Sequence, residues 1–388
     1  MNRSDIIDWA TEIYEDVGLS CVRQFLDDTP GRKAAGMLPV YVPREVVHGA
    51  GMLPVAIWGG GDRLEIIKGD AFYQSYICHL PRSVIELAQG GKFQALSAML
   101  FPSTCDVIRN LSGIWTMLYP GMYVRYLDVP QVLDQATGGV FWQSEMRELA
   151  RDLAGLSGIA PTPERMKAAI SLYNEARRLI RALYDQRRST PWAVPTAELY
   201  VLMRAGEVAP VELFIDKMKA YLAAVTETSM RPKDRARVVV TGSFCEQPPL
   251  GLIKTLERAG CYIVDDDFLL GNRFLTQDVS LDGDPFEALS SAFLHHVVPC
   301  SLVFEADPNG KRTLMQKRVA AAKAEGIIFA APSFCDPALL DQPMLRAGAD
   351  AANIPSISFR YAENSGQFQQ FREQAGTFAD SIKLWGDA

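Results

Sequence analysis

The sequence predicts an α/β protein made of two doubly wound parallel-sheet lobes, with an N-terminal helix and a helical connector. Its 388 residues are too many for one ordinary domain of roughly 150 residues. Hydrophobic residues make up 48% of the chain and charged residues 22%, which is a globular composition and excludes disordered and fibrous classes. In two separate stretches, short apolar runs alternate with helical segments, and this alternation is typical of parallel βαβ units.

The first part of the chain is divided into an N-terminal helical segment, residues 1–32, and a first lobe, residues 33–142. In the N-terminal segment, Ser4 can cap an amphipathic helix whose apolar residues recur at helical spacing. In the lobe, apolar runs separated by glycine and proline predict strands. The predicted strands are 37–42, 53–58 and 95–101, and helices are predicted to begin at residues 43 and 106.

The rest of the chain is divided into a helical connector, residues 143–235, and a second α/β lobe, residues 236–388. The connector is rich in Glu, Arg, Ala and Leu at helical period. The second lobe opens with an apolar, valine-rich run that is typical of a buried strand. The predicted strands of this lobe are 236–241, 262–264, 326–331 and 355–359.

Charge and hydropathy narrow the functional classes. The net charge of −7 disfavours nucleic acid as a partner, because a phosphate-binding surface is basic. No apolar run reaches the ~18 residues of a membrane span, so no membrane association is expected. The first residues are polar and lack an apolar signal core, which favours a cytoplasmic location. Seven cysteines are too sparse for a disulfide scaffold, and they serve as core packing, nucleophiles or metal ligands.

One cysteine-containing turn occurs three times. In each copy an apolar run leads into Pro or Gly, Ser, any residue, Cys and an acid, and the cysteines are Cys105, Cys245 and Cys335. All three thiols are therefore expected at the carboxyl ends of parallel strands, the edge where open α/β sheets bind ligands. A cysteine near a helix N-terminus meets unpaired backbone N–H groups, which favour the reactive thiolate.

The residues alone leave the chemistry of these thiols open. A nucleophile needs a base, but the sequence holds four histidines and none is paired with a cysteine by spacing. Zinc has little support, because no Cys-x-x-Cys or His-x-x-x-His pair occurs. Thiolates gathered from distant loops suit an iron–sulfur cluster between the lobes, for which Cys78 is a further candidate. Core packing remains the alternative for each cysteine.

Two other kinds of motif have a simpler interpretation. The acidic run of Asp265, Asp266 and Asp267 after a predicted strand is interpreted as a solvated loop rather than a hard-metal site. The glycine-rich segments 59–62 and 90–93 lack the spacing of nucleotide-binding loops and are interpreted as turns. The sequence therefore predicts no ATP site in this chain.

At these motifs the chain resembles the benzoyl-CoA reductase / 2-hydroxyacyl-CoA dehydratase family. The resemblance extends from about residue 30 to the end of the sequence. The order and spacing of the matching motifs are together more specific than any single motif. Within this family, the chain most resembles the smaller cluster-bearing subunit of the ATP-dependent reductases, and segments 72–78 and 242–249 carry this likeness. The other segments that carry it are 39–45, 51–54, Cys78, Cys105, 334–337 and 361–367.

The resemblance implies a 4Fe-4S cluster held by three cysteines, which match Cys78, Cys105 and Cys335. Cys245 lies outside that triad. Three roles remain open for it: a fourth cluster ligand, a residue that lines the substrate pocket, or a residue of the packed core. For the CoA ester, the candidate binding residues are Arg44, Arg109, Ser365 and Gln367. The implied reaction is two-electron reduction of the aromatic ring of benzoyl-CoA, or a related acyl-CoA, to a cyclohexadienoyl-CoA.

The implied partners are a homologous cluster-bearing subunit and separate ATP-hydrolysing electron-activator subunits, with reduced ferredoxin as upstream donor. ATP is thus used by the partners and not by this chain. One alternative is a subunit of a 2-hydroxyacyl-CoA dehydratase, which uses the same scaffold with one recyclable electron. A second alternative is a two-lobed small-molecule binding protein whose cysteines are structural.

Overall fold

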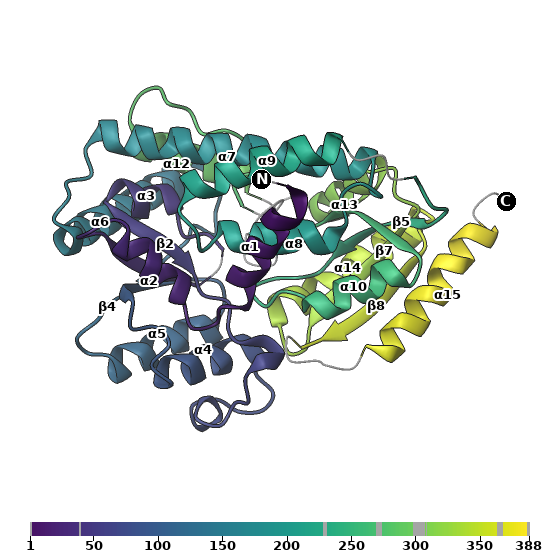
Figure 1. Ribbon diagram of the computed structural model, residues 1–388, viewed down its shortest axis with the longest axis horizontal. Coiled ribbons are helices and arrows are strands. Elements are labelled where there is room, and N and C mark those ends of the chain that lie inside the picture. Colours follow the sequence, from purple (N-terminus) through teal and green to yellow (C-terminus); the bar gives the residue numbers. More distant parts are fainter. Residues whose placement is uncertain are drawn as a thin grey trace.

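The computed structural model describes residues 2–38, 40–227, 231–268, 274–297, 307, 309–362 and 368–385. Two four-stranded parallel sheets flanked by helices form the two lobes, one on the left and one on the right of Figure 1. The predicted α/β class with two parallel-sheet lobes is therefore confirmed.

The first sheet has the strand order β2-β1-β3-β4. Its strands are β1 (Lys33–Met37), β2 (Met52–Ala56), β3 (Leu96–Pro102) and β4 (Tyr123–Leu127). The helices that accompany them are α3 (Arg44–Gly49), α4 (His79–Gln89) and α5 (Asp106–Leu118). Every residue of β2 is buried and β3 is nearly so, as expected for parallel strands covered on both faces.

The second sheet repeats this order as β6-β5-β7-β8. Its strands are β5 (Ala236–Thr241), β6 (Cys261–Asp266), β7 (Gly326–Pro332) and β8 (Ser356–Tyr361). Its helices are α10 (Leu250–Arg258), α13 (Gly310–Ala321), α14 (Asp336–Ala351) and α15 (Gln369–Trp385), whereas α12 (Pro285–His296) packs on α6 (Val140–Ser157) and α7 (Pro163–Ser189) beside the first lobe. In such an order the direction of winding reverses beside the first strand, which opens a crevice at the carboxyl ends of β5 and β7.

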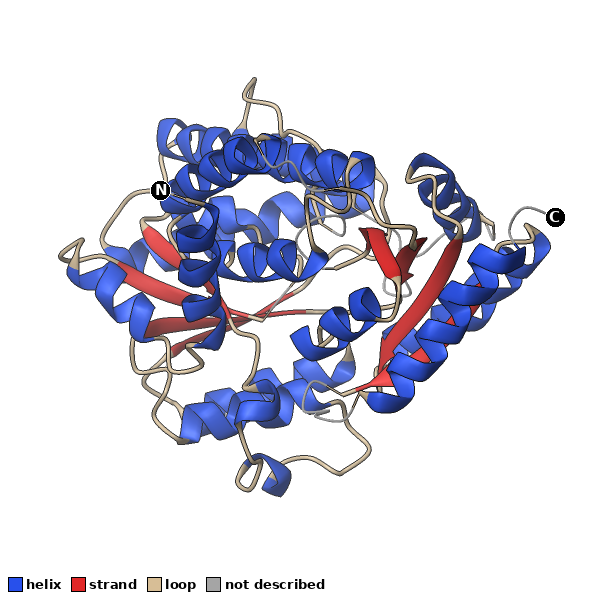
Figure 2. Ribbon diagram, turned by 45° about the vertical axis from the view of Figure 1, so that its right-hand side comes forward, coloured by secondary structure: helices blue, strands red, loops and turns tan. Residues whose placement is uncertain are grey.

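Long helices connect the lobes. They are α6 (Val140–Ser157), α7 (Pro163–Ser189), α8 (Thr196–Gly206) and α9 (Val211–Thr226). In Figure 1 and Figure 2, α7 and α9 run above the two sheets, whereas α6 and α8 lie at the height of the sheets. The N-terminal α1 (Arg3–Glu15) packs on α8 and α9, and α2 (Ser20–Asp27) follows it. Asn2 caps α1 through a reciprocal hydrogen-bonded pair with Asp5, so the expected cap at Ser4 is wrong by two residues.

Three sequence predictions about the first lobe are corrected. The strand expected at 37–42 ends at Met37, and Val40 and Tyr41 instead have positive φ angles of 79° and 68°. The N-terminal segment holds two helices rather than one, and β4 was not predicted. β1 was not recognised in the sequence because it consists largely of small residues, which give no clear strand pattern. The neighbouring strand requires a small residue at Gly36, since a Cβ there would lie 2.7 Å from a methyl carbon of Leu96.

The acidic run after β6 is also corrected, because it is neither solvated nor arranged for a metal. Asp265 and Asp266 are 1% and 0% exposed. Asp265 forms ion pairs with Arg188 at 3.2 Å and with Arg318 at 3.1 Å. Burial opposes its ionisation, yet these guanidinium groups lower the pKa of Asp265 below its usual value. The run therefore anchors helices α7 and α13 to the second sheet.

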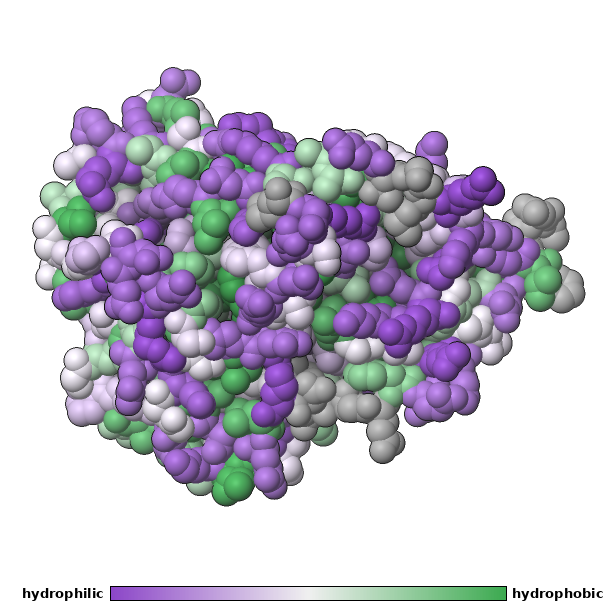
Figure 3. Space-filling model, in the orientation of Figure 1, coloured by the Kyte–Doolittle hydropathy of each residue, from purple (hydrophilic) through white to green (hydrophobic). Residues whose placement is uncertain are grey.

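Hydrophobic side chains on the face shown in Figure 3 are scattered among hydrophilic ones. Within the described part of the chain, no helix has both the length and the apolar character needed to cross a bilayer.

Candidate functional site

Three of the four candidate cysteines occupy the same structural position. Cys78, Cys105 and Cys335 are the N-cap residues of α4, α5 and α14, respectively. Cys105 follows β3 and Cys335 follows β7, so each lies at the carboxyl edge of its own sheet, as predicted. None of the three side chains forms a capping hydrogen bond to its own helix, so capping does not explain why cysteine stands at these positions.

The candidate cysteines of the two lobes gather at one place. Cys78 is partly buried, and burial is the main reason that its pKa rises well above the usual value for a thiol. Negative charge acts in the same direction, and it comes from one carboxylate and three thiols: Glu246, Cys335, Cys105 and Cys245. Two contacts between the lobes support this placement: Cys245 contacts the hydroxyl of Thr104 at 3.6 Å, and Glu246 accepts a hydrogen bond from the backbone N–H of His79 at 2.9 Å.

The helix N-terminus acts on Cys105 as expected, but it does not dominate. Burial raises the pKa of the Cys105 thiol, while the backbone N–H groups of Ile108 and Val107 oppose this rise. The expected effect of the helix N–H groups is thus present at Cys105, but burial outweighs it and the pKa of this thiol is raised.

Cys245 differs from the other copies of the repeated turn. After β5 the chain does not enter a helix at once, because α10 begins at Leu250. Cys245 lies in the intervening loop, is 6% exposed, and donates an S–H hydrogen bond to the hydroxyl of Thr104 at 3.6 Å. The three turns are thus not structurally equivalent, although all three place a cysteine in the same region.

The chemistry of the thiols bears on the kind of metal centre that they could hold. Among the residues that the structure describes, no group of three or more His, Cys, Asp or Glu side chains is already positioned to hold a metal ion. Thiols brought together from separate loops do fit the chemistry of an iron–sulfur cluster, whose several irons accept ligands spaced farther apart.

Two polar side chains beside the thiols were not singled out from the sequence. The hydroxyl of Tyr73 donates to the carbonyl of Val107 at 3.1 Å, in the first turn of α5. Burial, followed by the charges of Cys78 and Cys105, raises the pKa of Tyr73. The second is Glu246, the acid of the Cys245 turn, whose partner lies in the other lobe. Sequence spacing could not relate either residue to Cys78.

Backbone strain marks the same region. Phe334, which precedes Cys335, has a φ angle of +62° and is 56% exposed. A bulky residue in the left-handed region is unfavourable, and such strain concentrates at functional sites.

An open hollow adjoins Cys105. It encloses about 1400 Å³, including open solvent, and Arg109 and Phe141 line it together with the thiol. Arg109 is exposed and lies in the first turn of α5. The structure therefore brings this predicted substrate-binding residue and Cys105 to one surface.

The other predicted substrate-binding residues do not join them in the described structure. Arg44 forms an ion pair with Glu207 at 2.7 Å and donates to the carbonyl of Gly206 at 2.6 Å. These bonds hold it between α3 and α8. Ser365 and Gln367 lie outside the described residues.

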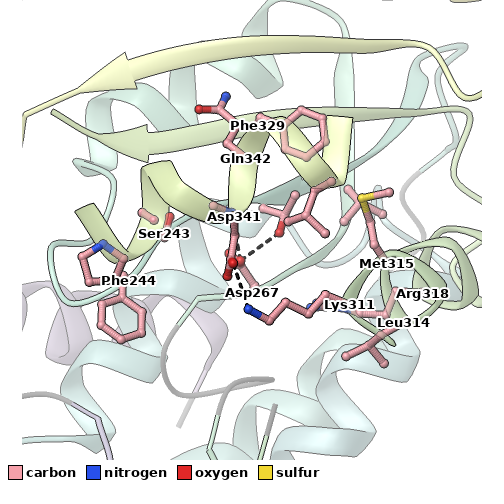
Figure 4. A pocket seen from close by; sticks show the side chains of 16 residues that line it. Ser243, Phe244, Asp267, Lys311, Leu314, Met315, Arg318, Phe329, Asp341 and Gln342 are labelled. Carbon is pink, nitrogen blue, oxygen red and sulfur yellow. Dashed lines mark hydrogen bonds and ion pairs between the residues drawn. The ribbon is translucent and has the colours of Figure 1, made fainter. Parts of the chain in front are cut away.

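A second cavity, of about 750 Å³, lies where β5 and β7 meet α13 and α14. Figure 4 shows Lys311 pointing toward Asp341, and the two form an ion pair at 2.9 Å. Asp267 accepts hydrogen bonds from the Thr241 hydroxyl and the Gly242 backbone N–H, both at 2.8 Å. Its charged groups are thus engaged with one another or with the turn that carries Cys245.

The remaining cysteines have no evident part in the site. Cys261 is fully buried in β6, and burial raises its pKa to about 12. Cys21 lies in α2, where burial and Asp16 raise its pKa to about 12. Cys300 lies outside the described residues.

Comparisons with known proteins identify relatives of this chain. A family described as 2-hydroxyglutaryl-CoA dehydratase, D-component, matches residues 39–382. The chain is 51% identical over 385 residues to one subunit of the benzoyl-CoA reductase of Thauera aromatica, and the match covers 99% of this chain and 100% of that protein. It is 26% identical over 354 residues to lactoyl-CoA dehydratase subunit beta of Anaerotignum propionicum and to (R)-phenyllactyl-CoA dehydratase beta subunit of Clostridium sporogenes, covering 91% of this chain and 92% of each relative.

Proposed function

The chain belongs to the 2-hydroxyglutaryl-CoA dehydratase D-component family of enzyme subunits, and from that premise we propose that it is the iron–sulfur subunit of an ATP-dependent, oxygen-sensitive benzoyl-CoA reductase. The reaction reduces the aromatic ring of benzoyl-CoA by two electrons to a cyclohexadienoyl-CoA. The observation that carries the proposal is the gathering of Cys78, Cys105 and Cys335, three N-cap thiols from two lobes, in a chain 51% identical to a subunit of such an enzyme.

In this proposal Cys78, Cys105 and Cys335 hold a 4Fe-4S cluster, which supplies low-potential electrons when bound. The chain's own contribution is the environment of these thiols. Cys335 is 6% exposed, whereas Cys78 and Cys105 are only partly buried and an open hollow adjoins Cys105. The bound acyl-CoA and the partner subunit would therefore complete the exclusion of water, which the addition of an electron to an aromatic ring requires because water would intercept the electron or the radical.

The hollow beside Cys105 is the proposed approach for the CoA ester. Arg109 presents a cationic side chain at its wall, and a guanidinium group is suited to phosphate or to a thioester carbonyl oxygen. Phe141 and the apolar wall offer a surface for an aromatic acyl group.

Partner proteins are part of the proposal. The relatives are named as subunits, and we infer a homologous cluster-bearing subunit and a separate ATP-hydrolysing pair that receives electrons from reduced ferredoxin. Within this chain, segment 90–93 forms turns between α4 and β3 without the helix that follows a phosphate-binding loop.

The test is turnover of the complete complex under anaerobic conditions. With benzoyl-CoA and reduced ferredoxin, the complex should consume ATP and electrons continuously and release a cyclohexadienoyl-CoA. Absence of ring reduction in a complex that holds iron and hydrolyses ATP would refute the assignment.

A 2-hydroxyacyl-CoA dehydratase subunit is the second candidate, because the matching family and the relatives at 26% identity carry dehydratase names. The same assay separates the two. A dehydratase would convert a 2-hydroxyacyl-CoA to its enoyl-CoA after a single activating electron, whereas a reductase uses electrons in proportion to product.

A further inference from the structure

The turn Gly242–Gln247 of the second lobe contacts both cysteine-bearing helix starts of the first lobe. Cys245 donates to the hydroxyl of Thr104, the residue before Cys105, at 3.6 Å. One residue further on, the carboxylate of Glu246 accepts a hydrogen bond from the backbone N–H of His79 at 2.9 Å. His79 directly follows Cys78 and is the first residue of α4. This one turn therefore contacts the residues that are adjacent in sequence to two of the proposed cluster ligands, Cys78 and Cys105.

Glu246 takes the place of a helix cap. The first N–H groups of a helix have no intrahelical acceptor, and the N-cap Cys78 supplies none to α4. Glu246 is 1% exposed, so water does not compensate the buried N–H. A negative charge also interacts favourably with the positive end of the helix dipole. The start of α4 is consequently held by a side chain 167 residues away.

The carboxylate is held in position by its own lobe. The hydroxyl of Tyr361, a fully buried residue of β8, contacts the hydroxyl of Ser243 at 3.1 Å and donates to the carbonyl of Glu246 at 2.9 Å. The amide of Gln247 donates to the carbonyl of Phe244 at 2.6 Å, across the same turn. These bonds hold the backbone of the turn, so the second lobe presents the Glu246 side chain to the start of α4 from a fixed position.

The carboxylate of Glu246 also lies close to the proposed cluster. It accepts a hydrogen bond from the backbone N–H of His79, the residue that directly follows Cys78. Its negative charge would oppose the arrival of an electron at a cluster bound to Cys78, because net charge near a cluster sets its reduction potential.

We propose that Glu246 is a positioning residue that fixes the Cys78 end of α4 against the second lobe and keeps the reduction potential of the bound cluster low. The proposal rests on the proposed function for the cluster, but the positioning part concerns contacts within this chain alone. It also gives the Cys245 copy of the cysteine turn a role, which is to contact the residues next to both first-lobe ligands.

The test compares Glu246→Gln, which keeps a hydrogen-bond acceptor, with Glu246→Ala, which does not. The control is Glu86→Gln, also in α4, because Glu86 accepts backbone N–H groups of Ile67 and Gly69 in an exposed loop. Each chain is purified anaerobically with its partners, and iron content and the midpoint potential of the cluster signal are measured by redox titration with electron paramagnetic resonance.

Glu246→Gln should retain the iron of the wild-type chain and shift the potential to more positive values, and Glu246→Ala should lose most of the iron. Glu86→Gln should match the wild type in both. An unchanged potential in Glu246→Gln, or full iron content in Glu246→Ala, would overturn the proposal.

A second readout keeps the two proposals separable. If the wild-type chain binds no iron, the proposed function fails, and amide hydrogen exchange of the cluster-free chain still tests the positioning role. The His79 N–H should then exchange about tenfold faster in Glu246→Ala than in Glu246→Gln. Equal exchange rates would show that Glu246 does not hold α4.

Discussion

The guanidinium of Arg187 lies 2.7 Å from the carboxylate of Asp266, and neither side chain has any exposure to solvent. Arg187 comes from α7 of the connector, and Asp266 ends β6 of the second lobe. The hydroxyl of Tyr184 donates to the same carboxylate at 2.9 Å. The connector is therefore fastened to the second sheet by a buried charge network rather than by apolar contact alone.

Removing one partner of this pair leaves a buried charge uncompensated. Arg187→Met should lower the free energy of unfolding by about 3–5 kcal/mol, measured by urea denaturation of the cluster-free chain. The control is Arg178→Met, since the pair between Arg178 and Asp278 is exposed and should be worth less than about 1 kcal/mol. Similar losses in both variants would contradict the buried-network interpretation.

His48 should make stability depend on pH. Burial, assisted by the positive charges of Arg32 and Arg44, lowers the pKa of His48 below its usual 6.5, although Glu212 opposes this. The folded chain therefore binds fewer protons than the unfolded chain in this range, and stability is lost as pH falls below about 6.5. His48→Gln should flatten the pH dependence of the urea midpoint between about pH 5 and 7, whereas the exposed His295→Gln should leave it unchanged.

Substitution at the strained residue Phe334 is expected to raise the free energy of unfolding, whereas Arg187→Met is expected to lower it. Glycine adopts a positive φ without the steric cost that phenylalanine bears at +62°. Phe334→Gly should therefore raise the free energy of unfolding by up to about 1 kcal/mol. Lys323→Gly, at a φ of 48° in the turn between α13 and β7, should give a similar gain. A loss of stability in Phe334→Gly alone would show that the phenyl contacts outweigh the strain.

Arg109 is expected to affect the CoA ester and not the cluster. Arg109→Ala should raise the KM for the acyl-CoA about tenfold in the complete complex, through loss of a charged contact, while iron content stays unchanged. Arg151→Ala removes another exposed arginine, in α6 of the connector, and should change neither quantity. An unaltered KM in Arg109→Ala would exclude the hollow beside Cys105 as the approach for the ester.

The parts of the fold that could be predicted are those with a local pattern. The apolar run of β5 is Ala236–Thr241 in both the prediction and the structure, because a buried parallel strand is hydrophobic on both faces. β4 was missed because it is an edge strand that mixes polar and apolar residues. Its Arg125 forms ion pairs with Glu145 and Asp152 of α6, contacts that the strand's own sequence does not reveal.

The site was predictable in a similar way. Strand-turn-helix patterns located Cys105 and Cys335, whereas Cys78 follows an irregular loop and was only a further candidate until the family resemblance placed it in the triad. The contact between Glu246 and His79 spans 167 residues, and no periodicity in a single sequence relates positions so far apart.

Iron and acid-labile sulfide content of the anaerobically purified chain, with its partners, tests the proposed cluster most directly. The wild-type chain should contain about four iron and four sulfide per chain. Cys78→Ala, Cys105→Ala and Cys335→Ala should each lose cluster iron, whereas Cys261→Ala, in the buried strand β6, should retain it. Full cluster occupancy in the Cys335 variant, or an iron-free wild-type chain, would contradict the proposed ligand set.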